Sequence, residues 1–264
     1  MIDDDMFEAD TEGYKQQETK RLSKRTRVSL FLLLVAIPLT IAAGFWLTDQ
    51  SALADWIDRV FGPRKYYLIS LVIVLYALLP FFMAFEGRKP EVRELVVLAT
   101  MIALATAGRA AFFMTPSFKP IIAFVIISAI AFGAEAGFLV GSMTMLVSNF
   151  LFGQGPWTPW QMFAMGFIGF LSGILYRLRI LPTKRLQLSV YGFLVTFMIY
   201  GGIMNPAALF MSVYQFSWSG LLAIYISGVP VDLVHASSTF LFLWIGAKPL
   251  LEKLQRIKVK YGLL

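Results

Sequence analysis

The stretch that decides the fold is residues 94–113, ELVVLATMIALATAGRAAFF, in which only Glu94 and Arg109 are charged. A helix needs about 20 predominantly apolar residues to cross the hydrocarbon core of a bilayer. The whole chain has this character: of 264 residues, 58% are hydrophobic and 15% are charged, and the mean hydropathy is +0.71. Soluble domains are roughly 45–50% apolar and about 25% charged. A soluble enzyme, a disordered tail and a disulfide-stapled secreted domain are therefore excluded, and the chain is read as an all-α integral membrane protein.

Runs of similar character predict eight transmembrane helices. Two of them are short and are separated only by residues 133–136, so we expect a tight helical hairpin whose real limits are wider. Residues 205–228 are apolar and aromatic but are interrupted by Pro206, and we expect an outer-surface segment that contains a partial helix. The predicted spans are residues 28–47, 66–85, 94–113, 120–132, 137–152, 161–176, 186–204 and 229–247.

The basic residues predict the orientation of these helices. If the N-terminus is cytoplasmic, 18 of the 23 Lys and Arg residues fall in inner segments and 5 in outer loops. Cytoplasmic loops of membrane proteins carry such an excess. We therefore expect a multi-pass protein of the bacterial cell membrane with both termini cytoplasmic. The net charge of +7 is then explained by the topology of the chain and by contacts with anionic lipids. It does not indicate binding of nucleic acid.

Polar residues divide the chain into four parts. We expect a polar and basic N-terminal tail (1–27), a two-helix membrane extension (28–93), a six-helix core (94–248) and a basic C-terminal tail (249–264). The chain has no cysteine and only one histidine, which excludes thiolate chemistry and a multi-histidine metal site. It also lacks the Gly-Lys-Ser/Thr ending of a phosphate-binding loop, so we expect no cofactor and no nucleotide hydrolysis.

Small residues recur at helical spacing in the predicted core. Ala99, Ala103, Ala107 and Ala111 are four residues apart on one helix. Such a face allows another helix to approach closely. Spacing alone is compatible with packing inside the bundle, the commoner use, and with docking of another subunit. Glycines at 133, 137 and 141, and at 169 and 173, form similar stripes, for which we predict internal packing.

The most distinctive passage is residues 152–161, FGQGPWTPWQ. Two glycines and two prolines prevent a regular helix there. Gln154, Trp157, Trp160 and Gln161 place flat rings beside amide groups, as a site for an organic ring requires. An interfacial aromatic belt is the alternative.

Further polar residues are predicted near the outer surface. Arg109 and Lys119 flank a loop that contains Phe113, and either interfacial snorkelling or ligand contact accounts for them. Asp232 and His235 are three residues apart and therefore lie on one helix face. They fit a structural hydrogen bond or a ligand contact, but the sequence shows no partnered nucleophile for catalysis. Asn149 is predicted on the same outer side.

These features together resemble the substrate-binding S components of energy-coupling factor (ECF) vitamin transporters. The resemblance covers residues 94–256 and is carried by the alanine stripe, Arg109 with the Pro-Ser-Phe-Lys-Pro loop, the 133–141 glycines, Ser148-Asn149, the Gly-Gln-Gly-Pro-Trp passage and Asp232 with His235. The passage looks closest to members associated with cobalamin or its precursors. The two helices before residue 94 depart from the usual six-helix family pattern.

The resemblance implies a vitamin-binding subunit that docks on a transmembrane coupling subunit driven by two ATPases, and not an enzyme. Ala99, Ala103 and Ala107 would contact the coupling subunit, and residues 110–119 would act as a lid. The expected substrate, favoured as a corrinoid, would be bound at the outer face. The residues expected to contact it are Arg109, Phe113, Asn149, Gln154, Trp157, Trp160, Gln161, Asp232 and His235.

Three alternatives stay open at this point. The first is an S component for another vitamin, such as riboflavin. The second is a self-sufficient secondary transporter, which is expected to show an internal repeat and polar residues on broken helices; no convincing repeat is visible. The third is a membrane-embedded enzyme, against which the single histidine and the scarcity of buried acids argue.

Overall fold

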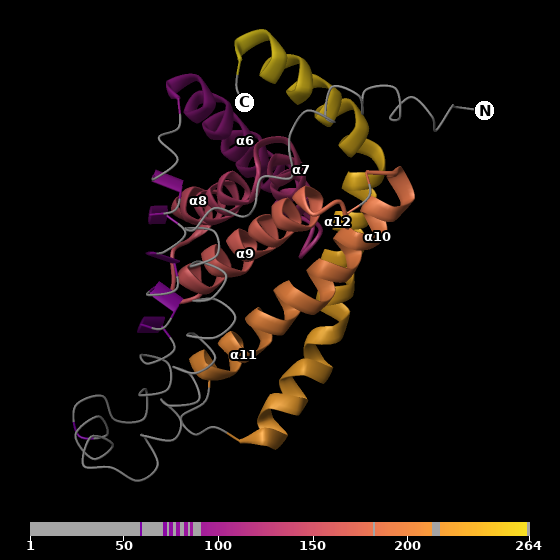
Figure 1. The fold of residues 1–264 in the computed structure, drawn as a ribbon. Helices are drawn as coiled ribbons and strands as arrows, with labels where there is room; N and C mark the ends of the chain where they lie inside the picture. Colours follow the sequence, from indigo (N-terminus) through magenta and orange to yellow (C-terminus); the bar gives the residue numbers. More distant parts are fainter. Residues whose placement is uncertain are drawn as a thin grey trace.

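The computed structural model describes residues 91–181, 183–212 and 217–262, together with Arg59 and scattered residues between 71 and 86. The predicted tail 1–27 and most of the predicted extension 28–93 lie outside the described residues. The described part is a bundle of helices (Figure 1). It contains α6 (Val92–Ala111), α7 (Ile121–Phe132), α8 (Ala134–Phe152), α9 (Thr158–Arg177), α10 (Arg185–Val195), the π-helical turn η4 (Thr196–Tyr200), α11 (Gly201–Ser212) and α12 (Trp218–Tyr261).

Five helices are long and apolar enough to cross a membrane: α6, α8, α9, the continuous helix Arg185–Ser212 and α12. The remaining helix α7 is apolar but has 12 residues. At 1.5 Å per residue it is about 18 Å long, shorter than the hydrocarbon core of roughly 30 Å. The all-α membrane prediction is confirmed. For the core we predicted six membrane-spanning helices. The described residues contain five candidate spans and one shorter apolar helix.

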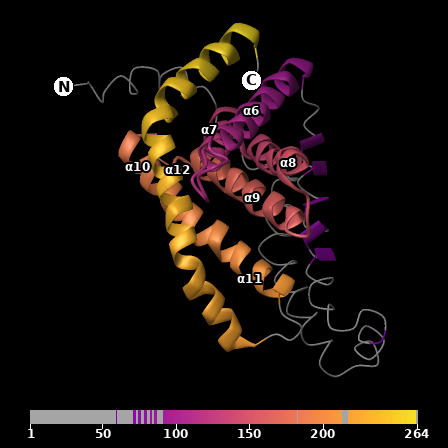
Figure 2. The same ribbon diagram turned by 180° about the vertical axis from the view of Figure 1, so that it is seen from behind.

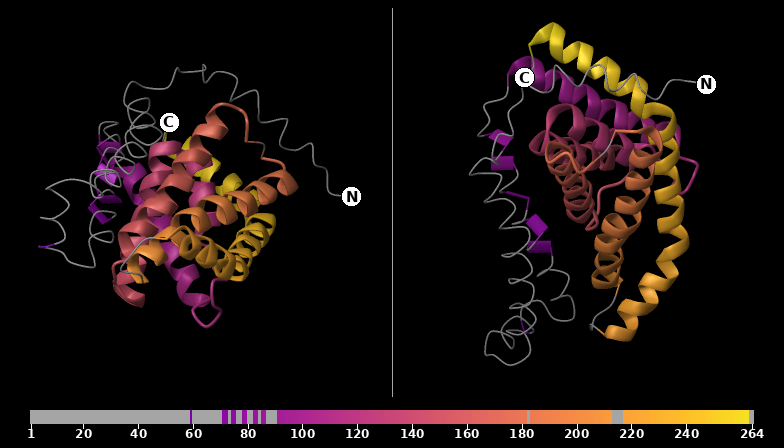
Figure 3. Two further views of the ribbon diagram at one scale, coloured as in Figure 1. Left: turned by 90° about the horizontal axis from the view of Figure 1, so that it is seen from below. Right: turned by 45° about the vertical axis from the view of Figure 1, so that its right-hand side comes forward.

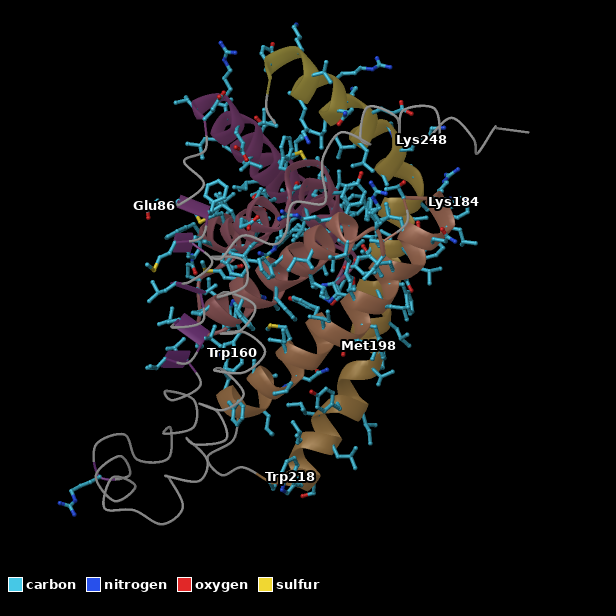
Figure 4. The ribbon with its side chains drawn as sticks, in the orientation of Figure 1. Glu86, Trp160, Lys184, Met198, Trp218 and Lys248 are labelled. Atoms are coloured by element: carbon cyan, nitrogen blue, oxygen red, sulfur yellow. The ribbon has the colours of Figure 1, made fainter. Side chains whose placement is uncertain are left out.

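The helices run between two ends of the bundle. We call the end that contains Arg109 and Thr158 the site end, and the end that contains Arg185 and Lys248 the basic end. In Figure 4, Lys184 and Lys248 lie close together at one end, and Trp218 lies at the other. The paired helices α10–α11 and α12 extend farther past the site end than α6–α9 do (Figure 3).

Gly133 forms the whole connection between α7 and α8. Its φ of 95° lies in the left-handed region that favours glycine, and its amide donates to the carbonyl of Ala129 at 2.9 Å. The predicted tight hairpin is therefore confirmed. Its second helix begins at Ala134, three residues earlier than expected, whereas the first helix is no longer than predicted.

Glycines allow α8 and α9 to pack backbone to backbone. A Cβ on Gly137 would lie 2.8 Å from the carbonyl oxygen of Gly169 and 2.5 Å from the Cβ of Ala129. A Cβ on Gly141 would collide with the backbone of Met165. Close approach of this kind is the usual means of helix association in a membrane. The predicted internal packing is confirmed for Gly137, Gly141, Gly169 and Gly173, whereas a Cβ on Gly133 would meet nothing within 4 Å.

The prediction for residues 205–228 is wrong in part. Residues 205–212 continue the seventh predicted span to Ser212, and residues 218–228 begin α12; residues 213–216 are not described. Pro206 and Pro230 both lie inside helices. Proline is tolerated in membrane helices because neighbouring groups satisfy the freed backbone carbonyl. We expected the polar residues and Pro206 to end the helix, but the helices continue through them.

The last part of α12 crosses the basic end of the bundle. The helix turns near Lys248, beside Pro249, and its C-terminal segment then runs toward the start of α6 (Figures 1 and 2). Lys258 is buried there and donates from Nζ to the carbonyl oxygen of Ala131 at 2.7 Å. The ammonium thus satisfies a carbonyl in the last turn of α7, where the helix dipole favours a cation.

Candidate ligand-binding site

Arg109 joins α6 to α8 at the site end. Its Nη1 atom donates to Ser148 Oγ at 2.6 Å and to Asn149 Oδ1 at 2.7 Å. The guanidinium also lies 5.2 Å from the centre of the Phe152 ring. Charged side chains within membrane spans are costly, and they usually pair with other groups. These contacts pair it with neutral groups, so its positive charge is not neutralised by them.

Asn149 is the buried centre of this cluster. It is fully buried, and its Nδ2 donates to Thr158 Oγ1 and to Gln161 Oε1, both at 2.9 Å. Its amide therefore accepts from α6 and donates to α9. These hydrogen bonds join the end of α8 to the start of α9, on either side of the loop in the passage 152–161.

The distinctive loop folds back on the same network. Thr158 Oγ1 donates to Gln154 Oε1 at 2.8 Å, and Gln154 Nε2 donates to the carbonyl of Leu146 at 3.1 Å. A Cβ on Gly155 would overlap the indole ring of Trp157. Gly155 is therefore needed for Trp157 to lie over the loop. We call Arg109, Ser148, Asn149, Gln154, Thr158 and Gln161 the amide cluster.

A second polar group forms between α11 and α12. Asn205 Nδ2 donates to Asp232 Oδ2 at 2.7 Å, and Asp232 is almost completely buried. Gly201 lets the carboxylate approach, because a Cβ there would lie 2.6 Å from Asp232 Oδ2. His235, one turn later, packs its ring edge-to-face with Tyr200 at 5.1 Å between centroids.

Tyr200 lies between these two polar groups. Its side chain is buried and is within electrostatic range of Arg109, Gln161 and Asp232. It belongs to the π-helical turn η4, a feature that is frequent at functional sites. Tyr200 thus connects the amide cluster to the Asp232–His235 face.

Two polar atoms near these groups have no partner among the described residues. They are Trp160 Nε1 and His235 Nδ1, and both are buried. Leaving a buried donor or acceptor unpaired costs about 1–3 kcal/mol. The Trp160 ring itself stacks on Phe210 of α11 at 6.4 Å, with an interplanar angle of 27°. Figure 4 shows Trp160 at the start of α9, on the site-end side of the bundle.

The loop between α6 and α7 is held against α12. Lys119 donates from Nζ to the carbonyls of Phe112 and Thr115, and its own carbonyl accepts from Ser238 Oγ at 2.8 Å. Burial lowers the pKa of Lys119, and the positive charge of Arg109 lowers this pKa further. The rings of Phe112, Phe118 and Phe242 pack together beneath the loop, with centroids 5.1–5.8 Å apart.

The comparisons with known proteins give one match. The model of a family described as "ECF-type riboflavin transporter, S component" matches residues 89–256. The chain belongs to this family. An S component is the substrate-specific subunit of an ECF transporter, not an enzyme; it binds a small vitamin and pairs with a coupling subunit and ATPases. Comparison with curated proteins and with solved structures gives no significant match.

The S-component structure brings most of the predicted site residues together, although their contact with a ligand stays a prediction. Arg109, Asn149, Gln154 and Gln161 share the amide cluster, and Asp232 and His235 contact the facing helix. Phe113 stacks on Phe152 at 5.2 Å but is more than half exposed, and Trp157 is also exposed. Tyr200, Phe210 and Phe152 are the residues that sequence reasoning missed. No motif marks them, because each is one aromatic residue in an aromatic-rich span.

The alanine stripe of this S component lies on its surface. Ala99, Ala103, Ala107 and Ala111 are all exposed, whereas Leu98, Met101 and Ala105 of the same helix are buried. Within the described part of the chain, α6 therefore uses its other face for packing in the bundle. Among residues 91–262, no helix packs on the alanine stripe.

Proposed function

We propose that this S component binds its vitamin at the site end, between the amide cluster and the Asp232–His235 face. The observation that carries the proposal is the pair of unpartnered buried atoms, Trp160 Nε1 and His235 Nδ1, beside a network that links α6, α8 and α9. A ligand that pairs with these atoms would remove their desolvation cost. The predicted residues Phe113 and Trp157 would then cover the ligand from the loops.

The same groups favour a planar heteroaromatic vitamin, for which riboflavin is the first candidate. Its ring edge carries alternating carbonyl and N–H groups, and its carbonyls would accept hydrogen bonds from Arg109, of which only Nη1 is used in the amide cluster. The Trp160–Phe210 pair supplies flat apolar faces for stacking. The description of the matching family also names riboflavin.

A corrinoid is the second candidate. The Gly-Gln-Gly-Pro-Trp passage favours it, because this passage resembles members associated with cobalamin or its precursors. Against it stands the compactness of the site: the polar groups of α6, α8 and α9 are already joined by hydrogen bonds of 2.6–2.9 Å. A corrin ring with its peripheral amides is far larger than a flavin and would have to separate these helices.

The charge distribution supports an orientation with the site end outside. Among residues 91–262, Arg109 and Lys119 are the basic residues of the site end, and ten others lie toward the basic end. By the positive-inside rule the basic end would lie in the cytoplasm of a bacterial cell, and in this proposal both termini lie on that side. In this proposal the residues before 94 form a tail and a two-helix extension, followed by the core to residue 248 and a basic tail.

We assign the exposed face of Ala99, Ala103 and Ala107 to the coupling subunit. Small side chains allow a partner helix to approach closely, and this face is not used within the described bundle. ATP bound by separate subunits would then supply the energy for release of the vitamin. A self-sufficient secondary transporter has no support from the family match.

Ligand retention tests the proposal. The full-length protein would be purified in mild detergent from cells supplied with riboflavin and cobalamin together, and the bound vitamin identified by absorbance and mass spectrometry. Stoichiometric riboflavin supports the first candidate, and stoichiometric corrinoid replaces it with the second. If neither these nor other vitamins are retained, the assignment of the site is overturned.

A further inference from the structure

Pro206 leaves one backbone carbonyl of α11 without its usual donor. In an α-helix the amide of residue 206 donates to the carbonyl of residue 202, but proline has no amide hydrogen. A hydroxyl group of α12 takes its place: Tyr225 Oη donates to the carbonyl oxygen of Gly202 at 2.9 Å. The interruption in one helix is therefore satisfied by a side chain of its neighbour.

The same stretch of α11 contains the features at which helices bend. The π-helical turn η4 ends at Tyr200, the pair Gly201-Gly202 follows, and Pro206 lies one turn farther on. Sharp bends in helices occur at prolines and at π-bulges, and glycine adds backbone freedom. A Cβ on Gly202 would meet nothing within 4 Å, so no close contact requires a glycine there. This stretch is therefore suited to act as a pivot.

Two sides of α11 contact two different helices. Asn205 faces α12, where its Nδ2 donates to Asp232 at 2.7 Å. Ala207 and Phe210, three residues apart, lie on the other side, where Phe210 stacks on Trp160 of α9. The helix packs more extensively on α12 than on α9, and it lies between them (Figure 1). A bend just before Ala207 would therefore separate α11 from α9 and leave its attachment to α12 in place.

The proposed vitamin site is closed in this arrangement. Trp160 Nε1 and His235 Nδ1 are buried atoms, so a ligand reaches them only after a segment has moved. The loop 112–119 is one candidate, but Ser238 and packed phenylalanine rings tie it to α12. Phe210 of α11 covers Trp160 directly, and α11 is the segment whose backbone is weakened.

We propose that α11 is a hinged gate to the vitamin site, which bends at residues 201–206 and is latched by Tyr225. This gate rests on the proposed vitamin-binding function. In the closed state the Tyr225 hydroxyl fixes the Gly202 carbonyl, and Phe210 covers Trp160. When α11 swings away from α9, water satisfies that carbonyl and Trp160 becomes accessible. Tyr225 is thus a positioning residue, which acts on the ligand through α11.

Modification of a single cysteine tests the hinge without any vitamin. The chain has no cysteine, and Ala207→Cys places one thiol at a position with 0% exposure, on the Phe210 side of α11. Its rate of reaction with methyl methanethiosulfonate measures opening. Adding Tyr225→Phe should raise this rate about fivefold, the equilibrium effect of one neutral hydrogen bond. Ser238→Ala, which removes a hydroxyl donor from the loop carbonyl of Lys119, should leave the rate within twofold.

Restoring the missing amide tests the latch itself. In Pro206→Ala the new N–H group donates to the Gly202 carbonyl, so adding Tyr225→Phe should no longer raise the rate. Gly202→Ala stiffens the pivot without a collision and should lower the rate about two- to fivefold. An unchanged rate in Tyr225→Phe, or an equal increase in the Pro206→Ala background, would overturn the latch. An unchanged rate in Gly202→Ala would overturn the pivot, and this variant does not depend on the folding of Tyr225→Phe.

Riboflavin binding kinetics then test whether the hinge is the entrance. The latch closes both the free and the bound protein, so Tyr225→Phe should raise the association and dissociation rates about fivefold each and leave Kd within twofold. Stopped-flow quenching of riboflavin fluorescence measures both rates. Faster association in Ser238→Ala, with Tyr225→Phe unchanged, would make the loop the entrance and overturn the gate. Failure to bind riboflavin at all would contradict the vitamin assignment, whereas the cysteine rates would still decide the hinge.

Discussion

Arg109 in α6 donates a 2.7 Å hydrogen bond to Asn149 in α8, and both residues lie at the same end of the bundle although 40 positions separate them. The Asn149 amide in turn donates two hydrogen bonds to side chains of α9. One arginine is therefore held by a neutral, buried network and keeps its positive charge beside the proposed vitamin site.

The first prediction concerns the positive charge of Arg109. Arg109→Gln should weaken vitamin binding about 10- to 100-fold, because hydrogen bonds to charged groups contribute about 1.5–3 kcal/mol. Binding would be measured by isothermal titration of the detergent-solubilised protein. Arg93→Gln makes the same change in the first turn of α6, at an exposed position, and should leave the affinity unchanged. Equal affinity of the two variants would remove Arg109 from the site.

Much of this arrangement could be read from the sequence. Apolar runs and glycine spacing predicted the hairpin at residues 133–136, the internal packing of the glycine stripes and the all-α membrane class, because these depend on local spacing. Arg109 and Asn149 were each predicted as polar residues near one surface. Their hydrogen bond could not be predicted, because it depends on how α6 and α8 are aligned. The periodicity within one helix does not determine its alignment with another.

The region 205–228 shows a different limit. Pro206 and the polar residues that follow it indicate an irregular segment by the rules of soluble helices. In the structure Asn205 instead pairs with Asp232, and Gly201 admits the carboxylate. Polar residues that seem to interrupt a helix are thus satisfied by the neighbouring helix. Tyr200 was missed for the related reason that its position depends on a π-helical turn.

The second prediction concerns the alanine face. Ala99→Trp and Ala103→Trp should abolish ATP-dependent uptake in cells that contain the coupling subunit and ATPases, because a bulky ring prevents close helix approach. Vitamin binding to the isolated S component should be unchanged. Ile226→Trp, at an exposed position of α12, should transport normally. Loss of vitamin binding in the alanine variants, with subunit assembly intact, would contradict a docking role.

The third prediction compares two glycines. Gly169→Ala should lower the unfolding free energy by about 1–3 kcal/mol, because the added methyl collides with the backbone of Gly137. Gly202→Ala is the matched control, since a Cβ there meets nothing within 4 Å. It should be neutral or slightly stabilising. Thermal unfolding in detergent measures both, and equal midpoints would mean that α8 and α9 are not packed so closely.

The fourth prediction concerns the C-terminal segment of α12. Lys258→Met should detach this segment from α7, because it removes the hydrogen bond to the Ala131 carbonyl, worth about 1.5–3 kcal/mol for a charged donor. Limited proteolysis after residue 248 should become faster. Lys260→Met, at an exposed position two residues later, should be cleaved at the original rate. Unchanged proteolysis in Lys258→Met would show that other contacts hold the segment.

The last prediction uses the unpartnered Trp160 Nε1. Trp160→Phe keeps an aromatic ring against Phe210 but removes the N–H group. In the vitamin-free protein the lost packing and the relieved desolvation oppose each other, so the unfolding midpoint should change little. Vitamin affinity should fall about 5- to 10-fold, as for one neutral hydrogen bond of about 1 kcal/mol or slightly more. Trp218→Phe, at an exposed ring outside the proposed site, serves as the control for indole loss. A large drop in the vitamin-free midpoint with unchanged affinity would make Trp160 a packing residue only, whereas the opposite pattern means that its N–H group is kept for the ligand.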